Sequence, residues 1–202
     1  MKRSLTAPLI IIILSLLPAM SHATEFKQGV HYQAIDNPSV TSTPTFTEYF
    51  SFFCAQCYRF SKTFAPVVRK KLPTNIKFRQ VHVDGSQVTN ELSKAYVLAE
   101  RLHKDIEVET VLFDAIHQHK DRPKNIEDVL KLVTQSSLND KSYAQVNSFT
   151  VNSAVAANRA EVKHFNITVI PTLIVNGKYQ INYSSLKSEQ QLIELVTYLV
   201  AK

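Results

Sequence analysis

Short runs of β-branched and aromatic side chains predict the strands of this protein. Residues 45–50 (TFTEYF) and 77–83 (KFRQVHV) are rich in aromatic, threonine and valine residues, which favour strands. Residues 167–181 hold two more β-rich runs, which are separated by Asn176 and Gly177. This dipeptide is a strong signal for a tight β-hairpin. We therefore expect two strands early in the chain and a hairpin late.

Apolar positions with helical spacing dominate the middle of the chain. Asn125 and Asn139 are expected to cap helices, because their side chains can accept a hydrogen bond from the first turn. Ser188 and Gln191 have the spacing of a capping box that opens a last helix. The four helix-like segments of the middle region are residues 89–103, 106–119, 126–133 and 143–165.

The order of these elements is typical of an α/β core interrupted by an all-helical insertion. We place the first part of the core at residues 24–84 and the insertion at residues 85–165. The second part of the core, with the hairpin and the last helix, is placed at residues 166–202.

The first 23 residues have the three-part layout of a secretory signal peptide. Lys2 and Arg3 form a basic head, residues 5–17 are mostly apolar, and Ser21 and Ala23 supply small side chains at the cleavage position. The apolar run is short for a membrane span, which makes an uncleaved anchor the weaker alternative. We predict cleavage after Ala23 and export.

Charge and composition exclude several classes of function. The chain of 202 residues has a net charge of +6, which falls to +4 once Lys2 and Arg3 leave with the leader. No block of basic residues is interleaved with aromatic ones, so we expect no nucleic-acid partner. An apolar fraction of 45% is typical of a globular protein and argues against disorder.

The two cysteines carry the strongest functional signal. Cys54 and Cys57 are three positions apart and are the only cysteines in the sequence. A disulfide between them would close a very short loop and would add little stability. A structural zinc site needs about four ligands, and the histidines show no spacing that would complete one. We therefore expect a redox-active pair, with no metal and no separate cofactor.

The surroundings of the pair favour redox chemistry. The expected strand ends at residue 50 and residues 58–62 continue as a helix, which places Cys54 at the helix N-terminus. Unpaired backbone N–H groups and the helix dipole stabilise a thiolate there and lower its pKa. Cys57 lies one turn further on and is less exposed. This arrangement predicts Cys54 as the nucleophile and Cys57 as the resolving thiol.

The sequence resembles the DsbA family of bacterial periplasmic thiol:disulfide oxidoreductases. The similarity lies in residues 48–60, which include FFCAQC, in KKLP at 70–73 and in IPTLIVNGKYQ at 170–180. It covers essentially the whole chain after the leader. The resemblance implies a thioredoxin fold with an inserted all-helical subdomain and a periplasmic location. It also implies the oxidation of reduced exported proteins and reoxidation by a quinone-linked membrane oxidase of the DsbB type. We expect a monomer.

The resemblance also assigns further site residues. Pro171 matches the cis-proline that faces the cysteine pair, and the backbone at Ile170 would hold an extended substrate segment as an added strand. Glu48 matches a buried acid beneath the site, whose raised pKa would let it exchange a proton with Cys57. An ordinary trans proline and a solvated glutamate at a sheet edge are the alternatives.

Three positions depart from the best-known members of the family. Gln56 replaces a histidine, Ala55 a proline, and Gln80 a lysine near the buried acid. We place Gln56 among the substrate contacts, and the lost charges predict a weaker oxidant. A reductase or isomerase on the same fold, or a peptide-binding chaperone, is the alternative function. The segment between the leader and residue 45 is too short for the dimerising module that isomerases use.

Overall fold

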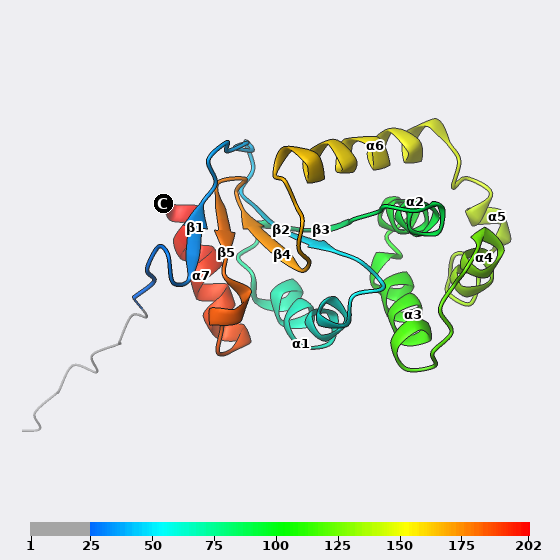
Figure 1. The fold of residues 1–202 in the computed structure, drawn as a ribbon, viewed down its shortest axis with the longest axis horizontal. Helices are drawn as coiled ribbons and strands as arrows, with labels where there is room; N and C mark the ends of the chain where they lie inside the picture. Colours follow the sequence, from blue (N-terminus) through cyan, green and yellow to red (C-terminus); the bar gives the residue numbers. More distant parts are fainter. Residues whose placement is uncertain (1–24) are drawn as a thin grey trace, which may run out of the picture.

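The fold is a mixed sheet with helices on both faces and a block of helices at one end (Figure 1). The computed structural model describes residues 25–202, so the predicted leader lies outside the described residues. Within them, the elements in chain order are β1 (Tyr32–Ala34), β2 (Thr45–Phe50), α1 (Ala55–Lys71), β3 (Lys77–His82), α2 (Gln87–Arg101), α3 (Asp105–His117), α4 (Ile126–Val133), α5 (Asp140–Tyr143), α6 (Phe149–His164), β4 (Thr172–Val175), β5 (Tyr179–Ile181), the 3-10 helix η1 (Tyr183–Ser185) and α7 (Glu189–Ala201).

The sheet places β2 between two partners. Its strand order is β1-β5-β4-β2-β3, with β2 parallel to β3 and antiparallel to β4. β5 pairs antiparallel with both β4 and β1. All six residues of β2 are buried, and the register sets Glu48 opposite Gln80 of β3. The segment that leads to the cysteine pair therefore begins at the end of a fully buried strand.

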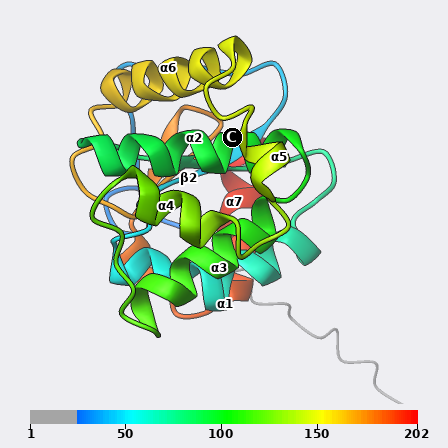
Figure 2. The same ribbon diagram turned by 90° about the vertical axis from the view of Figure 1, so that its right-hand side faces the viewer.

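Helices cover the two faces of the sheet unequally. α1 and α7 lie on one face, and α6 crosses the other (Figures 1 and 2). On the first face Phe46 of the sheet packs in one cluster with Val68 of α1 and Leu195 of α7. On the second face Tyr49 and Ile174 contact the end of α6 and the residues that follow it. Both faces are thus buried, as expected for an α/β core.

The helical block consists of α2 to α5, which face the viewer in Figure 2. Its core contains Leu92, Leu112 and Val129, and the same cluster includes Phe52 and Cys57. The block therefore packs directly against the segment that carries the cysteines. α2 follows β3 and α6 leads back to β4, so the block is an insertion between two strands of the sheet.

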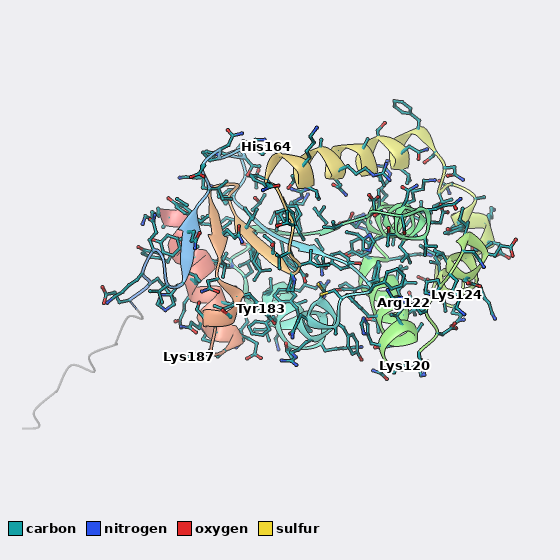
Figure 3. The ribbon with its side chains drawn as sticks, in the orientation of Figure 1. Lys120, Arg122, Lys124, His164, Tyr183 and Lys187 are labelled. Carbon is teal, nitrogen blue, oxygen red and sulfur yellow. The ribbon has the colours of Figure 1, made fainter. Side chains whose placement is uncertain are left out.

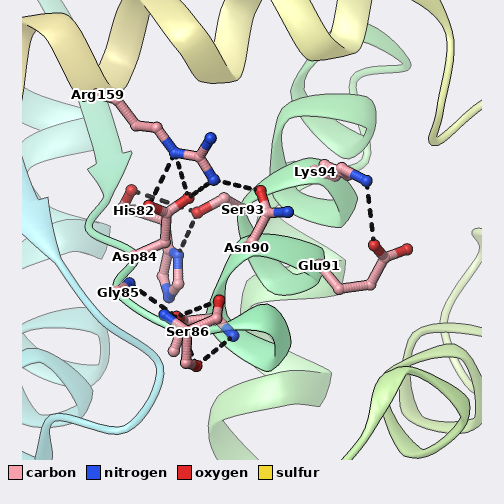
Figure 4. Close-up of polar contacts among 10 residues, drawn as sticks. His82, Asp84, Gly85, Ser86, Asn90, Glu91, Ser93, Lys94 and Arg159 are labelled. Carbon is pink, nitrogen blue, oxygen red and sulfur yellow. Dashed lines mark hydrogen bonds and ion pairs between the residues drawn. The ribbon is translucent and has the colours of Figure 1, made fainter.

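The two connections between the sheet and the block are joined by polar contacts (Figure 4). Arg159 of α6 donates to both carboxylate oxygens of Asp84 at 2.9 to 3.1 Å and to the side-chain oxygen of Asn90 in α2. His82, at the end of β3, is buried, and its Nδ1 lies 2.7 Å from Oγ of Ser93. These contacts fix α6 and the start of α2 to the end of β3.

Most predicted elements are confirmed, with two corrections. The strand at 45–50 and the helix at 126–133 have the predicted bounds, and β3, α2 and α3 differ by one or two residues. The single helix predicted at 143–165 is wrong, because Ser148 caps a new helix by accepting from the N–H of Val151. β1 was not predicted, since a three-residue strand carries too little pattern.

The predicted hairpin is confirmed, and it needs a glycine. Asn176 and Gly177 have φ of 52° and 63°, as a tight hairpin turn requires. A Cβ at Gly177 would also collide with the carbonyl oxygen of Ser39. The predicted cap of the last helix is half correct. Ser188 accepts from the N–H of Gln191, but the side chain of Gln191 accepts from the residue before Ser188.

Candidate active site

Cys54 is the N-cap residue of α1, as predicted. Its Sγ accepts a hydrogen bond from the N–H of Cys57 at 3.2 Å, and its own N–H donates to the carbonyl of Ser51 at 3.0 Å. Cys54 is half-buried and Cys57 is completely buried, and both are free thiols. The more exposed sulfur is therefore the one at the helix N-terminus. Gln56 lies between them and is exposed on the first turn.

The two thiols have opposite pKa shifts. The pKa of Cys54 is lowered to about 6, mainly because its sulfur accepts a hydrogen bond from the Cys57 thiol. The N–H groups of Cys57 and Gln56 lower it further, while partial burial opposes them. The pKa of Cys57 is raised, first because its thiol donates to Cys54 and then because burial disfavours its thiolate; Glu48 adds to this rise when it is ionised. At neutral pH Cys54 is a thiolate and Cys57 keeps its proton.

The segment before β4 lies directly against Cys54. The Ile170–Pro171 peptide bond is cis, so the alternative of a trans proline is wrong. The carbonyl oxygen of Ile170 is 3.7 Å from Sγ of Cys54. A groove of about 430 Å³ runs beside this segment, and Pro171 and Tyr183 contribute to its walls. Val169 is 69% exposed at its edge, which leaves an apolar surface next to the thiolate.

Glu48 is buried in the middle of β2, so the alternative of a solvated edge glutamate is wrong. It is 1% exposed, and its Oε2 accepts a hydrogen bond from Nε2 of Gln80 at 2.8 Å. Burial raises the pKa of Glu48 well above its usual value, and the carboxyl of Glu109 raises it further. The hydrogen bond from Gln80 and the charge of Arg69 oppose this rise without cancelling it. Burial therefore favours the protonated form of Glu48.

A cluster of buried polar groups surrounds the amide of Gln80, which uses all its hydrogen-bonding positions. Its Nε2 donates to Glu48 and also to Oε1 of Glu109 at 2.9 Å. Its Oε1 accepts from Arg69 at 2.5 Å and from the hydroxyl of Tyr96 at 3.1 Å. Arg69 is also ion-paired with Glu109 at 2.6 Å. The cluster thus connects β2 and β3 with helices α1, α2 and α3 around one amide.

Three residues near the site were not predicted. Arg69 lies in α1 and Glu109 in α3, far from the cysteines in sequence. Glu109 does carry a signal, because it shares the buried face of its helix with Leu112 and Phe113. His117 lies beside the segment that carries the cysteines. Its Nε2 is 2.8 Å from the carbonyl oxygen of Phe52, and its ring is stacked on that of Tyr58.

No three His, Cys, Asp or Glu side chains between residues 25 and 202 are grouped so that they could hold a metal ion. In that range, no helix combines the length and apolar character needed to cross a membrane.

A thioredoxin-type sheet with a reactive thiol pair at a helix N-terminus defines a thiol:disulfide oxidoreductase. The family model described as Thioredoxin matches residues 39–195. DsbA of Escherichia coli O6:H1 is 30% identical over 191 residues, which cover 89% of this chain and 91% of that protein. DsbA of Salmonella typhimurium is 32% identical over 190 residues, with the same two coverages. The chain belongs to the DsbA family of thiol:disulfide interchange proteins.

Solved structures agree with this assignment. DsbA of Klebsiella pneumoniae superimposes with a TM-score of 0.78 at 28% identity, over 89% of this chain and all of that chain. A cysteine-to-serine variant of Proteus mirabilis DsbA, in complex with a non-covalently bound peptide, gives a TM-score of 0.79 at 26% identity, over 88% of this chain. The predicted thioredoxin fold with an inserted helical subdomain is confirmed.

Proposed function

We propose that this protein oxidises newly exported proteins in the periplasm by donating a disulfide between Cys54 and Cys57. The observation that carries the proposal is the opposite shift of the two thiol pKa values, with that of Cys54 lowered to about 6 and that of Cys57 raised. A stabilised Cys54 thiolate favours the reduced enzyme and is a good leaving group. Both properties favour transfer of the disulfide to a client protein.

In the first step a client thiolate attacks Sγ of Cys54 in the oxidised enzyme. The Cys54–Cys57 bond breaks, a disulfide forms between the client and Cys54, and Cys57 leaves as a thiolate. Because the pKa of Cys57 is raised, its thiolate takes up a proton. Glu48 is the proposed donor, since burial favours its protonated form and the effect of its ionised form on the pKa of Cys57 indicates that the two groups interact.

In the second step another client thiolate attacks the client sulfur of the mixed disulfide. The client disulfide forms and Cys54 leaves as a thiolate, so two electrons have passed from the client to the enzyme. The backbone at Ile170 and the groove beside Pro171 hold the client segment in an extended form. Gln56 is exposed beside Cys54 and contacts the same segment.

The reduced enzyme must return its two electrons to an oxidant. We assign this role to a quinone-linked membrane oxidase of the DsbB type, in which the quinone takes up the electrons. The predicted signal peptide at residues 1–23 supports a periplasmic location, where disulfides persist. No metal or separate cofactor takes part in the proposed cycle.

A single-turnover experiment tests the function. The oxidised mature protein is mixed with a reduced peptide that has two cysteines, quenched with acid and analysed by mass spectrometry. We expect one peptide disulfide per enzyme, with a transient adduct on Cys54. A Cys54→Ser variant that still promotes client folding at the full rate would favour the chaperone alternative. Equilibration with glutathione buffers measures the reduction potential. A reductase of the thioredoxin kind has a potential of about −270 mV, and an oxidase has a less negative one.

A further inference from the structure

A loop of the helical block places the guanidinium of Arg122 against the segment that leads to Cys54. Arg122 lies between α3 and α4, and its guanidinium carbon is 4.1 Å from the centre of the Phe53 ring. Phe53 directly precedes Cys54 in the chain. A guanidinium stacked on an aromatic ring is attracted to its π electrons, so this contact holds the charge beside the entrance to the site.

The charge of Arg122 is not neutralised by a carboxylate. Within residues 25–202, Arg69, Arg79 and Arg159 each form an ion pair with a glutamate or aspartate, whereas Arg122 forms none. Stacking uses the face of the guanidinium and leaves the N–H groups at its edge available for a carboxylate. Packing on Phe53 and binding of an acidic group are therefore compatible.

The loop that contains Arg122 holds two further exposed cations, Lys120 and Lys124. Residues 119–124 (HKDRPK) contain three lysine or arginine residues and one acid, Asp121. Figure 3 shows Lys120, Arg122 and Lys124 on the side of the helical block, with Lys187 and Tyr183 on the opposite side.

Two of the acids near this loop have partners: Asp114 is ion-paired with Lys62, and Asp128 accepts from the backbone N–H of Lys124. Glu127 follows the loop and is exposed on the first turn of α4. The loop itself holds three cations and one acid, so its net charge is positive.

We propose that the loop of residues 119–124, with Arg122 at its centre, selects client segments that carry aspartate or glutamate next to the reacting cysteine. This inference rests on the proposed oxidase function and names a substrate class for it. The client sulfur must reach Cys54, so residues beside the client cysteine come within reach of Phe53 and of the cation stacked on it. A carboxylate there gains a charge-assisted hydrogen bond or, at longer range, electrostatic attraction.

The expected preference is modest and depends on salt. One exposed ion pair of this kind raises a rate constant about twofold to fivefold. The gain should shrink as salt rises, because charges at a protein surface are screened. The apolar edge at Val169 and the groove beside Pro171 remain available to every client, so uncharged segments are oxidised as well, only more slowly.

The test compares three dithiol peptides that differ only in glutamate, glutamine or lysine beside the reacting cysteine. Each is oxidised in a single turnover by the oxidised mature protein in quenched flow. Acidic neighbours also raise the pKa of the peptide thiol, so each rate is divided by the rate of the same peptide with hydroxyethyl disulfide. Arg122→Met keeps the apolar stem and removes the charge, and Arg122→Glu reverses it.

Arg101→Met is the matched control. Arg101 is exposed and lies beside the C-terminal end of α1, whereas Cys54 lies at the N-terminal end. A helix of 17 residues is about 25 Å long, so Arg101 is remote from the site.

We expect the normalised ratio of glutamate to lysine peptide to exceed two in the wild type and in Arg101→Met. It should fall toward one in Arg122→Met and below one in Arg122→Glu. Equal rates in the wild type, or a ratio that persists in both Arg122 variants, would overturn the proposal and leave the oxidase function standing. If the wild type oxidises none of the peptides, the oxidase function itself is contradicted, and this proposal with it.

Discussion

Replacing Glu109 by glutamine is expected to lower the pKa of Glu48 and to alter the pH dependence of client oxidation. Both carboxyl groups bond to Nε2 of Gln80, and Arg69 is the cation paired with Glu109. The charge of Glu109 is one of the causes that raise the pKa of Glu48. The variant removes this charge and leaves Glu48 as the only carboxyl of the cluster that can balance Arg69.

The size of the effect follows from the geometry. The carboxylate oxygens bond to one nitrogen at 2.8 and 2.9 Å. They therefore lie within about 6 Å, where two unit charges interact by about 3 kcal/mol at an effective dielectric constant of about 20. Since about 1.4 kcal/mol corresponds to one pKa unit, the pKa of Glu48 should fall by up to about two units. Burial still raises it, so it should remain above the value of a solvated glutamate.

The assay is a carbon-13 NMR titration of the glutamate carboxyl groups, with Glu48 assigned from a Glu48→Gln variant. The oxidised protein is used, because the thiolate of Cys54 also raises the pKa of Glu48. In parallel, single-turnover client oxidation is measured against pH. Once Glu48 is ionised it cannot give a proton to Cys57, so the pH above which the rate declines should move down in Glu109→Gln.

Glu127→Gln is the control, since Glu127 is exposed on the first turn of α4. Urea unfolding of both variants checks that the fold persists. If Glu48 titrates at the wild-type pH in Glu109→Gln, the two carboxyls are not coupled through the cluster and the reasoning is refuted. If the titration moves but the rate profile does not, Glu48 is not the proton donor to Cys57.

Three further predictions concern the thiols and a buried histidine. Brief alkylation of the reduced protein near pH 7 should label Cys54 and spare Cys57, because the pKa of Cys54 is lowered to about 6 and that of Cys57 is raised; mass spectrometry that finds mainly Cys57 labelled would contradict the mechanism. Gln56→His should lower the pKa of Cys54 further and make the protein more oxidising by about 30 mV for each pKa unit, as measured by thiolate absorbance and glutathione equilibration. Burial lowers the pKa of His82 to about 3, so the unfolded state binds a proton below pH 6.5 that the folded state excludes. His82 alone should therefore lower the free energy of unfolding by about 2 kcal/mol between pH 7.5 and pH 5, while the raised pKa of Glu100, about 7, acts in the opposite sense. The check is the difference in unfolding free energy in urea between the wild type and His82→Gln, which should change by this amount over that range; a difference that is independent of pH would contradict it.

The fold was predictable where the pattern is local. The strand at 45–50 and the Asn176–Gly177 hairpin follow from residue types alone, and the structure has both. The error at 143–165 has a physical cause, because helix-forming residues run through a segment that Ser148 divides by offering a second cap. Among the described strands β1 lies at the sheet edge and pairs with β5, and three residues show no period that could identify such an edge strand.

The candidate site was predictable to the extent that it lies in contiguous motifs. Cys54 and Cys57 sit one turn apart at the start of a helix, and this placement requires no knowledge of the tertiary fold. Arg69 and Glu109 meet at the site only because α3 packs near α1, and no local pattern reports that contact. The packing of His117 against the carbonyl of Phe52 also joins segments far apart in the sequence, so no local pattern could reveal it.

The partly buried cation Arg69 bears on the argument about oxidising strength that the sequence suggested. Gln80 replaces a lysine of the family's best-known members, and the sequence alone indicates that the cluster has lost its positive charge. In the structure Arg69 reaches the same amide from α1, but it also forms an ion pair with the acid Glu109. The charges of Arg69 and an ionised Glu109 cancel, so this pair does not restore the net positive charge that a lysine at position 80 would add. The charge loss that lies nearest to Cys54 is the one at Gln56, which is exposed on the first turn of α1.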